Sequence, residues 1–365
     1  MTGAPAEPRA AARLDADGPL ELLSERALFT GGAPRRRTAA SIARIEADGR
    51  LLLVFSQTPD TALGNQAALM LSTSDDSGRS WAEPYPLYAL PGWFCMALGG
   101  LARIADDDIR LLLGRIQIDP TLGGTEPITG WHLASSTSRD GGRTWSEPGP
   151  EIRLFPAWTE LYGASNPHPL ANGGLLWAAM GTDGRDTTWH AGVSFTDAAA
   201  SAFSPPVIIA REPGRDYSDI DAVRLTDGRF LAVIREHQTL QSVASWSGDE
   251  GRTWSPLRPT PFLGSNIKLF RLRSGAVVCA YRDEDPARRG VSLSWTQDGG
   301  ESWALLGQLY AADVDAQHEP GSVCGYPDLI SLGDDRVLGV LHTYPGPGGI
   351  ELRCLALRDR TTPAG

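Results

Sequence analysis

Ser74-Asp-Asp-Ser-Gly-Arg-Ser-Trp81 is the first of four segments with the pattern S/T-x-D-x-G-x-S/T-W. The other three are Ser138-Arg-Asp-Gly-Gly-Arg-Thr-Trp145, Ser247-Gly-Asp-Glu-Gly-Arg-Thr-Trp254 and Thr296-Gln-Asp-Gly-Gly-Glu-Ser-Trp303. The aspartate can accept hydrogen bonds from backbone N–H groups of the turn that follows, and the glycine supplies a positive φ. The tryptophan then re-enters the sheet and buries a large apolar area. The pattern therefore predicts a β-hairpin in which every fixed position has a structural role, and none of these residues is expected to be catalytic.

A second repeat, of short apolar strands, has six copies. Each copy follows an acidic or glycine-containing turn, and the first residues of successive copies are 47 to 64 positions apart. The copies are Asp48-Gly-Arg-Leu-Leu-Leu-Val-Phe55, Asp108-Ile-Arg-Leu-Leu-Leu113, Asn172-Gly-Gly-Leu-Leu-Trp177, Asp227-Gly-Arg-Phe-Leu-Ala-Val-Ile234, Ser274-Gly-Ala-Val-Val-Cys279 and Asp335-Arg-Val-Leu-Gly-Val-Leu341. The aspartates of the hairpin pattern step by 64, 109 and 49 residues, so we expect one degenerate hairpin near Ser194-Phe-Thr-Asp197.

Short β-rich units without helical periodicity are typical of a β-propeller. Six units of this length account for the whole chain, so the sequence predicts an all-β fold, a six-bladed β-propeller of four-stranded blades. We expect it to be a single domain over residues 19–365. We expect the segment Leu20–Thr30 to lend a strand to the last blade, beside residues 349–357, because ring closure removes free sheet edges. Residues 1–18 have the composition of a disordered tail.

The composition excludes several classes of protein. A formal net charge of −11 disfavours nucleic acid as a partner, because such proteins neutralise phosphates with basic surface. No apolar run approaches the roughly 20 residues that span a membrane, and the N-terminal residues lack a secretory apolar segment, so a cytoplasmic location is expected. The four cysteines are far apart, which fits reduced thiols, and no metal-ligand spacing or cofactor fingerprint occurs in the sequence.

The repeated hairpin pattern is the Asp-box, and its copies along the chain resemble those of the sialidase (neuraminidase) superfamily, roughly from residue 35 to 357. This resemblance implies a sialidase-like propeller. It also implies a site with three arginines for the substrate carboxylate, a tyrosine nucleophile, a carboxylate that activates the tyrosine, and an aspartic acid as proton donor. Because one fold hosts many activities, each of these positions has to be matched separately.

Three positions match the family pattern well. The segment Gly325-Tyr-Pro-Asp-Leu-Ile330 resembles the family's tyrosine segment and implies Tyr326 as the nucleophile. Arg235 ends the strand after a D-G turn and corresponds to the family's second arginine, with Arg282 as a rival one unit later. Arg289 lies seven residues before Thr296 and corresponds to the third arginine, although the adjacent Arg288 is an alternative.

Three other positions depart from the family. Asp219 lies sixteen residues before Arg235, where the family has a glutamate, so the activating carboxylate would be one methylene shorter. In Arg35-Arg-Arg-Thr38 the first arginine is assigned to Arg37, with an offset of a residue or two. Asp60, in the loop after the first repeated strand, is assigned as the proton donor.

Together these residues indicate an exo-acting retaining hydrolase for a terminal acidic sugar, either sialic-acid-like or a related ulosonic or uronic acid. Three guanidinium groups can bind the sugar carboxylate through charge-assisted hydrogen bonds. A neutral phenol avoids the repulsion that a carboxylate nucleophile would meet at a centre that already carries negative charge. The expected partner is therefore a glycan with an acidic terminal sugar, without a metal or cofactor.

Two alternatives remain open. The first is another carbohydrate-active propeller, a lyase or a hydrolase with His/Tyr chemistry, because several histidines lie at strand ends. They are His168, His190, His237, His318 and His342. The second is a non-catalytic glycan-binding propeller, in which tryptophans outside the Asp-boxes would stack on sugar rings.

Overall fold

The computed structural model describes residues 13–30, 33, 35–45, 48–60, 64–97, 100–105, 107–119, 128–152, 160–163, 167–182, 188–197, 203–312, 324–343 and 349–361. The regular elements in these ranges are β-strands, which pair antiparallel in five sheets. Two four-stranded sheets follow the chain: β3 (Arg37–Arg44), β4 (Leu51–Gln57), β5 (Ala68–Ser74) and β6 (Tyr85–Tyr88), then β7 (Phe94–Met96), β8 (Leu101–Arg103), β9 (Ile109–Ile118) and β10 (Ile128–Ser138). The third sheet contains β11 (Glu160–Gly163), β12 (His168–Pro169), β13 (Leu175–Thr182), β14 (His190–Thr196) and β15 (Val207–Ala210).

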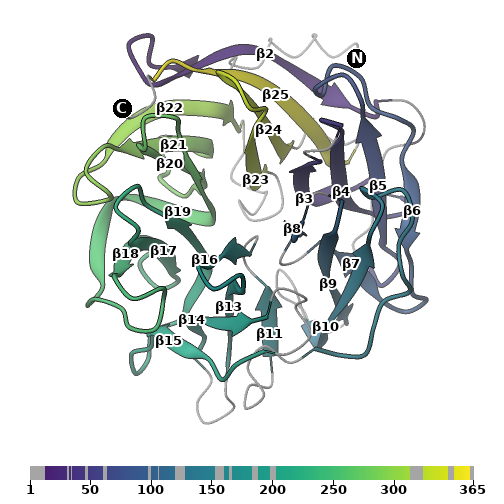
Figure 1. Ribbon diagram of the computed structural model, residues 1–365, viewed down its shortest axis with the longest axis horizontal. Coiled ribbons are helices and arrows are strands. Elements are labelled where there is room, and N and C mark those ends of the chain that lie inside the picture. Colours follow the sequence, from purple (N-terminus) through teal and green to yellow (C-terminus); the bar gives the residue numbers. More distant parts are fainter. Residues whose placement is uncertain are drawn as a thin grey trace, which may run out of the picture.

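The remaining strands form one large sheet and one small sheet. The eight-stranded sheet contains β16 (Tyr217–Arg224), β17 (Phe230–Glu236), β18 (Gln241–Ser247), β19 (Arg258–Arg271), β20 (Val277–Asp283), β21 (Gly290–Thr296), β22 (Ala304–Ala311) and β1 (Arg13–Leu14). The last sheet has the order β2 (Leu20–Leu28), β25 (Glu351–Asp359), β24 (Arg336–Thr343) and β23 (Cys324–Ser331). The sheets surround a central axis, with β3, β8, β16, β19 and β23 closest to it (Figure 1). This all-β arrangement is propeller-like.

The long strand β19 joins two successive antiparallel units. Its first part pairs with β18, up to Leu263 opposite Gln241, and its second part pairs with β20, starting at Gly264 opposite Asp283. One strand is therefore the outer strand of one unit and the inner strand of the next, which explains why eight strands belong to one sheet.

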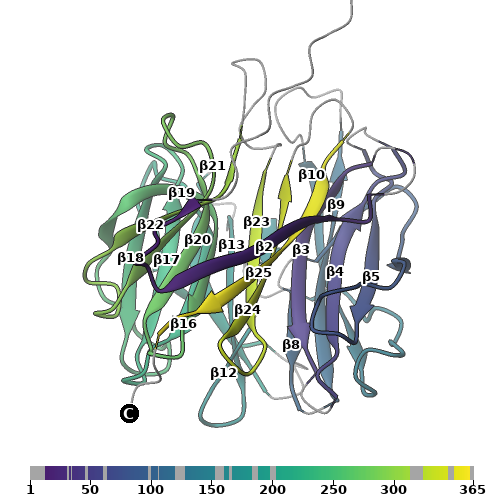
Figure 2. The ribbon, with the colours of Figure 1, turned by 90° about the horizontal axis from the view of Figure 1, so that it is seen from above.

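The two ends of the chain close the ring. Strand β2 pairs with β25 from Leu20 opposite Asp359 to Leu28 opposite Leu352, and the two strands cross the outside of the ring together (Figure 2). The prediction that the segment Leu20–Thr30 adds a strand beside residues 349–357 is confirmed. The segment expected to be disordered, residues 1–18, differs in part: Arg13 and Leu14 form β1, which pairs with Gln308 and Gly307 of β22, while residues 1–12 lie outside the described ranges.

The Asp-box turns have the hydrogen bonds that the sequence pattern predicts. In the second copy, Thr144 donates to Asp140 Oδ1 from its backbone N–H at 2.9 Å, and Ser138 Oγ donates to the same oxygen at 2.8 Å. The Gly142 N–H donates to Ser138 Oγ at 2.8 Å, and Trp145 Nε1 donates to the Gly142 carbonyl at 3.1 Å. Hydrogen bonds from Thr144 are the largest cause that lowers the pKa of Asp140 to about 2.

The same turns connect neighbouring sheets. Gly142 has a φ of 82°, and a Cβ there would lie 2.6 Å from a methyl carbon of Leu52 on the preceding sheet. Gly300, with a φ of 98°, lies in the same way over Leu231, which belongs to the preceding unit of the eight-stranded sheet. The glycine therefore provides both the positive φ and the space for a leucine of the preceding sheet or unit.

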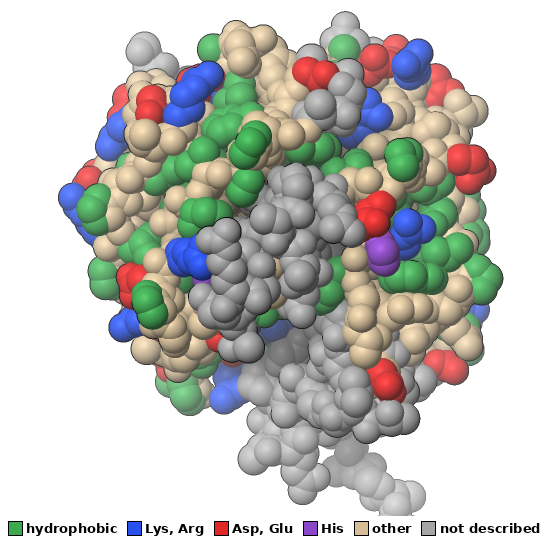
Figure 3. Space-filling view, turned by 90° about the horizontal axis from the view of Figure 1, so that it is seen from below, with side chains coloured by type: hydrophobic (Ala, Val, Ile, Leu, Met, Phe, Trp, Pro, Cys, Tyr) green, Lys and Arg blue, Asp and Glu red, His purple; other side chains and the backbone are tan. Residues whose placement is uncertain are grey.

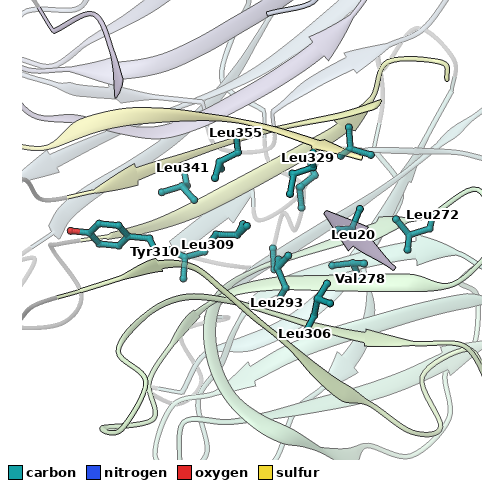
Figure 4. Packing of buried hydrophobic residues seen from close by; sticks show 14 of the residues in the cluster. Leu20, Leu272, Val278, Leu293, Leu306, Leu309, Tyr310, Leu329, Leu341 and Leu355 are labelled. Atoms are coloured by element: carbon teal, nitrogen blue, oxygen red, sulfur yellow. The ribbon is translucent and has the colours of Figure 1, made fainter. Parts of the chain in front are cut away.

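Buried apolar side chains fill the spaces between successive sheets. The cluster between β19–β22 and the last sheet includes Leu20, which comes from near the N-terminus and packs close to Val278 and Leu306 (Figure 4). A fully buried leucine contributes about 1.5–3 kcal/mol relative to an exposed one, so this seam is held by packing as well as by strand pairing.

Buried charges near the axis connect inner strands to one another. Asp221 Oδ2 accepts a hydrogen bond from the Leu269 N–H at 2.7 Å, and Asp328 Oδ2 accepts one from the Ile42 N–H at 2.9 Å. Lys268 Nζ lies between the two carboxylates, 3.3 Å from Asp328 and 4.0 Å from Asp221. These bonds fix the inner strands relative to one another.

All four cysteines are buried free thiols. The cytoplasmic location remains a prediction. In the described ranges no helix is long and apolar enough to cross a membrane, and no group of three or more His, Cys, Asp or Glu side chains could hold a metal ion. Basic and acidic side chains are interspersed on the lateral face shown in Figure 3.

Candidate active site

Four inner strands contain a bulge at an equivalent place. Each strand shifts its register by the same pattern, between Thr38 and Ser41 in β3 and at the corresponding residues of the others. One residue within each bulge has a positive φ near 50°: Ala39 (51°), Asp219 (45°), Asn266 (50°) and Tyr326 (46°). Non-glycine residues rarely adopt this conformation, which costs about 1–3 kcal/mol and tends to occur at functional sites. The sequence-predicted residues Asp219 and Tyr326 therefore occupy equivalent positions around the axis.

The strands next to these bulges supply a second ring of side chains. Arg235, Arg282 and His342 pair with the residues just before three of the bulges, namely Ser218, Ser265 and Gly325. Each of the three lies sixteen residues after the bulge residue of its own unit. Two guanidinium groups and one imidazole are thus placed at the same level by the same local geometry.

Arg282 is buried beside the backbone of the predicted nucleophile. Only 6% of Arg282 is exposed, and its Nε donates a hydrogen bond to the carbonyl of Cys324 at 2.5 Å. A Cβ on Gly325 would lie 2.7 Å from Arg282 Nη2, so this arginine can approach the Gly325–Tyr326 segment only because position 325 is glycine. Among the described residues, no carboxylate lies within 4.0 Å of the Arg282 guanidinium.

Asn266 approaches the same side of this glycine as Arg282. Its Oδ1 would be 2.3 Å from a Cβ on Gly325, and 91% of the residue is buried. Within the described part of the chain this oxygen accepts no hydrogen bond. A buried acceptor without a donor is costly, so this oxygen is a candidate contact for a ligand N–H or O–H.

Arg235 belongs to a network with two carboxylates. Its Nη1 is 3.2 Å from Asp219 Oδ2, and its Nη2 is 4.0 Å from Glu284 Oε1. Glu284 is 8% exposed and accepts a hydrogen bond from Ser265 Oγ at 2.5 Å. The charge of Arg235 is therefore partly compensated by the protein, in contrast to that of Arg282.

Tyr326 contacts both an imidazole and an apolar cluster. Its ring lies 5.6 Å from the ring of His342, at an angle of 32°. Burial, with further contributions from Arg282 and Arg36, holds the pKa of His342 well below its usual range, so this imidazole is neutral at neutral pH. Tyr326 also packs against a cluster formed by Ala39, Ala67, Phe94, Met96, Ile116 and Met180, together with Trp131 and Trp189.

The same apolar cluster connects Tyr326 to Asp219. The backbone N–H of Asp219 contacts Met180 Sδ at 2.9 Å, and Met180 belongs to the cluster against which Tyr326 packs. Trp131 and Trp189 meet edge to face with their centroids 6.4 Å apart. A site that contains both guanidinium groups and aromatic rings suits an anionic sugar, whose carboxylate and C–H faces need different partners.

The structure places Arg37 outside this arrangement. Arg37 Nε donates to Gln57 Oε1 at 2.8 Å, and the side chain lines a pocket at the edge of the first sheet. Its neighbour Arg36 instead lies close enough to His342 to affect the pKa of the imidazole. Successive residues of a strand point to opposite faces, so only one of the two can reach the axis.

The remaining two predicted residues lie in loops that precede or follow the strands of the site. Asp60 follows β4 and lines a small pocket of about 140 Å³ with Thr58 and Gln66, and its carbonyl accepts a hydrogen bond from the Arg36 N–H at 3.3 Å. Arg289 directly precedes β21, and its carbonyl accepts a hydrogen bond from the Ala312 N–H at 2.9 Å. The described contacts of Tyr326 are with His342 and the apolar cluster, so the roles of Asp60 and Arg289 remain predictions.

Sequence reasoning missed Asn266 and Glu284. A signal for Asn266 exists, because Asp219, Asn266 and Tyr326 each precede a polar residue of the next strand by sixteen positions. Glu284 has no such signal, since its place beside Arg235 depends on the contact between two successive units.

These features define a class of protein: a propeller-like β protein with a polar, arginine-containing site at its axis. A model of the BNR repeat-like domain matches residues 116–343, which is more than half of the chain. The chain therefore belongs to the BNR repeat-like family. No curated protein matches it.

Solved structures with the same fold include proteins of several kinds. A protein of unknown function from Dyadobacter fermentans DSM 18053 has a TM-score of 0.76 and 18% identity over 94% of this chain and 100% of that chain. The NanB sialidase from Streptococcus pneumoniae has a TM-score of 0.65 and 12% identity over 93% of this chain and 71% of that chain. An α-L-arabinanase from Penicillium chrysogenum has a TM-score of 0.63 and 14% identity over 94% and 99%. At these identities the likeness establishes the fold alone.

Proposed function

We propose that this protein is an exo-acting retaining glycoside hydrolase that removes a terminal acidic sugar, with Tyr326 as its nucleophile. The observation that carries the proposal is Arg282, a buried guanidinium beside the Gly325–Tyr326 backbone for which the described residues offer no carboxylate. A buried charge requires a partner, and a sugar carboxylate would provide one through charge-assisted hydrogen bonds.

In this proposal Arg282 and Arg36 hold the substrate carboxylate, in place of the Arg37 expected from the sequence. Both arginines are among the causes that lower the pKa of His342, whose ring contacts Tyr326, and this supports the assignment. Arg235 contributes less, because Asp219 and Glu284 already compensate part of its charge. Arg289 remains the candidate for a third contact.

Tyr326 attacks as a neutral phenol. Its Oη forms a bond to the anomeric carbon while its proton passes to the carboxylate of Asp219, and the bond from that carbon to the leaving oxygen breaks. Asp60 protonates the leaving oxygen as the alcohol departs. Asp60 then removes a proton from water as the water oxygen bonds to the anomeric carbon and the bond from that carbon to Tyr326 Oη breaks. The phenolate that leaves recovers its proton from Asp219. Two displacements at one carbon retain its configuration.

The proposal assumes six blades. The eight-stranded sheet would count as two blades that share β19, and the other four sheets would supply one blade each. Six buried clusters between neighbouring units support this count, with a seventh cluster at the axis around Tyr326.

The test is the release of methylumbelliferone from glycosides of sialic acid, glucuronic acid and arabinofuranose. We expect release from an acidic glycoside, a loss of at least about 10³-fold in kcat for Tyr326→Phe, and unchanged rates for Tyr85→Phe, which alters an exposed tyrosine of β6. Full activity of Tyr326→Phe would end the nucleophile assignment. Release from the arabinofuranoside alone would replace the acidic sugar with a neutral one.

A second candidate is a lyase that acts on a uronate-containing chain. The specific observation is the contact between the rings of Tyr326 and His342, because a neutral imidazole beside a phenol could remove a proton next to a sugar carboxylate. A lyase forms an unsaturated product that absorbs in the near ultraviolet, whereas a hydrolase does not.

A further inference from the structure

A separate pocket of about 620 Å³ lies at the seam between the first and the last sheet. It is lined by Phe29, which follows β2, and by residues of the first sheet and its loops, including Arg35, Arg37, Met70 and Glu83. Its volume is in the usual range for small-molecule sites. The axial side chains Arg282, Tyr326 and His342 do not line it.

Strand alternation directs two arginines into this pocket. Arg35 and Arg37 both line it, while Arg36 between them lies near His342 at the axis. The segment is fixed to the last sheet, because the Ile350 N–H donates to the Arg35 carbonyl at 3.0 Å and the Arg37 N–H donates to the Ile350 carbonyl at 2.9 Å. The two guanidinium groups thus project from a held backbone.

The charge of this pocket is incompletely compensated. Arg37 Nε donates to the neutral amide of Gln57 at 2.8 Å, and Glu83 is the acidic residue that lines the same pocket. Within the described ranges neither Arg35 nor Arg37 forms a salt bridge. Burial, followed by the positive charge of Arg35, lowers the pKa of Arg37, although Glu83 and Glu351 act in the opposite direction.

The walls of the pocket suit a sugar ring that carries the anion. Phe29, Met70, Pro84 and Pro86 provide apolar surface, and Gln57 and Gln66 provide amide groups. Apolar surface can contact the C–H faces of a pyranose, while the amides can bond its hydroxyl groups. A guanidinium binds a carboxylate through two parallel hydrogen bonds.

We propose that this pocket, termed the seam pocket, binds a carboxylate-bearing sugar unit. Thr58, Pro59 and Gln66 line both the seam pocket and the smaller pocket that contains Asp60, so the two are adjacent. The unit bound here is the further acidic unit of a chain whose terminal sugar lies at the axis, a link that rests on the proposed function. The substrate is then an oligosaccharide with more than one acidic sugar.

Methionine methyl groups can report on the two sites separately. Met70 lines the seam pocket, whereas Met96 and Met180 belong to the cluster around Tyr326, and Met1 completes the set of four methionines. Protein labelled with [¹³C]methyl-methionine is titrated with glucuronate, with glucose as the neutral control. We expect glucuronate to shift the Met70 resonance and glucose to leave it unchanged.

Variants assign the shift to the two arginines. Arg37→Gln is expected to weaken the binding of glucuronate reported by Met70 by about tenfold. Arg50→Gln, which alters an arginine paired with Asp48 and Asp75 instead, is expected to leave it unchanged. Unchanged Met96 and Met180 resonances in each unliganded variant verify that the fold is retained.

Three outcomes would overturn the proposal that the seam pocket binds a carboxylate-bearing sugar. They are an unshifted Met70 resonance with glucuronate, an equal shift with glucose, or equal affinity for glucuronate in Arg37→Gln. Failure of the proposed hydrolase would instead appear as absent turnover, or as unshifted Met96 and Met180, with the Met70 response intact. Digalacturonate tests the link between the seam pocket and the axial site. A ligand that spans both sites shifts the Met70 and Met180 resonances at the same ligand concentration.

Discussion

Gly325→Ala tests the geometry that brings Arg282 and Asn266 to the nucleophile. The new methyl carbon would lie 2.3 Å from Asn266 Oδ1, 2.7 Å from Arg282 Nη2 and 3.0 Å from Arg282 Nε. Both side chains would have to move, which would break the hydrogen bond from Arg282 to Cys324. A hydrogen bond to a charged group contributes about 1.5–3 kcal/mol, and a φ of 145° adds about 1–3 kcal/mol of backbone strain for alanine.

The assay is urea unfolding of Gly325→Ala and of a control, Gly228→Ala. Gly228 also has a positive φ, 87°, but a Cβ there has no atom within 4 Å, so the control measures backbone strain alone. We expect Gly325→Ala to lower the free energy of unfolding by about 2 kcal/mol more than Gly228→Ala and to abolish turnover. Equal losses in the two variants would show that no close contact exists at Gly325, and the account of Arg282 would be wrong.

Three further predictions concern the axis and the Asp-boxes. Lys268→Met leaves the buried carboxylates of Asp221 and Asp328 without their ammonium, so calorimetry should show a loss of about 3–5 kcal/mol, and a neutral result would contradict the network. Asn266→Leu removes a buried acceptor at the candidate site, so it should raise KM by about tenfold, and an unchanged KM would remove Asn266 from the site. For Asp140 the folded pKa of about 2 lies below the ordinary 3.8, so its stabilising effect is present above about pH 4 and is lost as the pH falls toward 2. The stability difference between the protein and Asp140→Asn should shrink over that interval in urea titrations, and a constant difference would contradict the assignment.

The propeller-like fold could be predicted because its signals are local. Each Asp-box contains the acceptor, the glycine and the tryptophan of one turn within eight residues, so a short pattern specifies a complete structural unit. Ring closure by residues 20–28 was also predictable, since an apolar strand at each end of the chain needs a partner. The pairing of β1 with β22 was not, because two residues have no periodicity to recognise.

The candidate site was only partly predictable because it depends on bulges. A bulge changes which residues face the axis, and its position in β3 determines that Ala39 lies where Asp219 and Tyr326 lie in their own strands. Counting residues from a family motif therefore reached Tyr326 and Asp219 but assigned Arg37 to a site that its neighbour Arg36 approaches. Contacts between units, such as that of Glu284 with Arg235, have no counterpart in the linear sequence.

The central claim is that Tyr326 attacks an acidic sugar held by Arg282. Its most direct test is peptide mass spectrometry after incubation with an acidic glycosyl fluoride that carries a second fluorine beside the anomeric carbon, which slows hydrolysis of the covalent intermediate. The account predicts one adduct, on Tyr326, and none in Tyr326→Phe or in Arg282→Gln at the same concentration. An adduct on Asp60, Asp219 or Glu284, or equal labelling of Arg282→Gln, would contradict it.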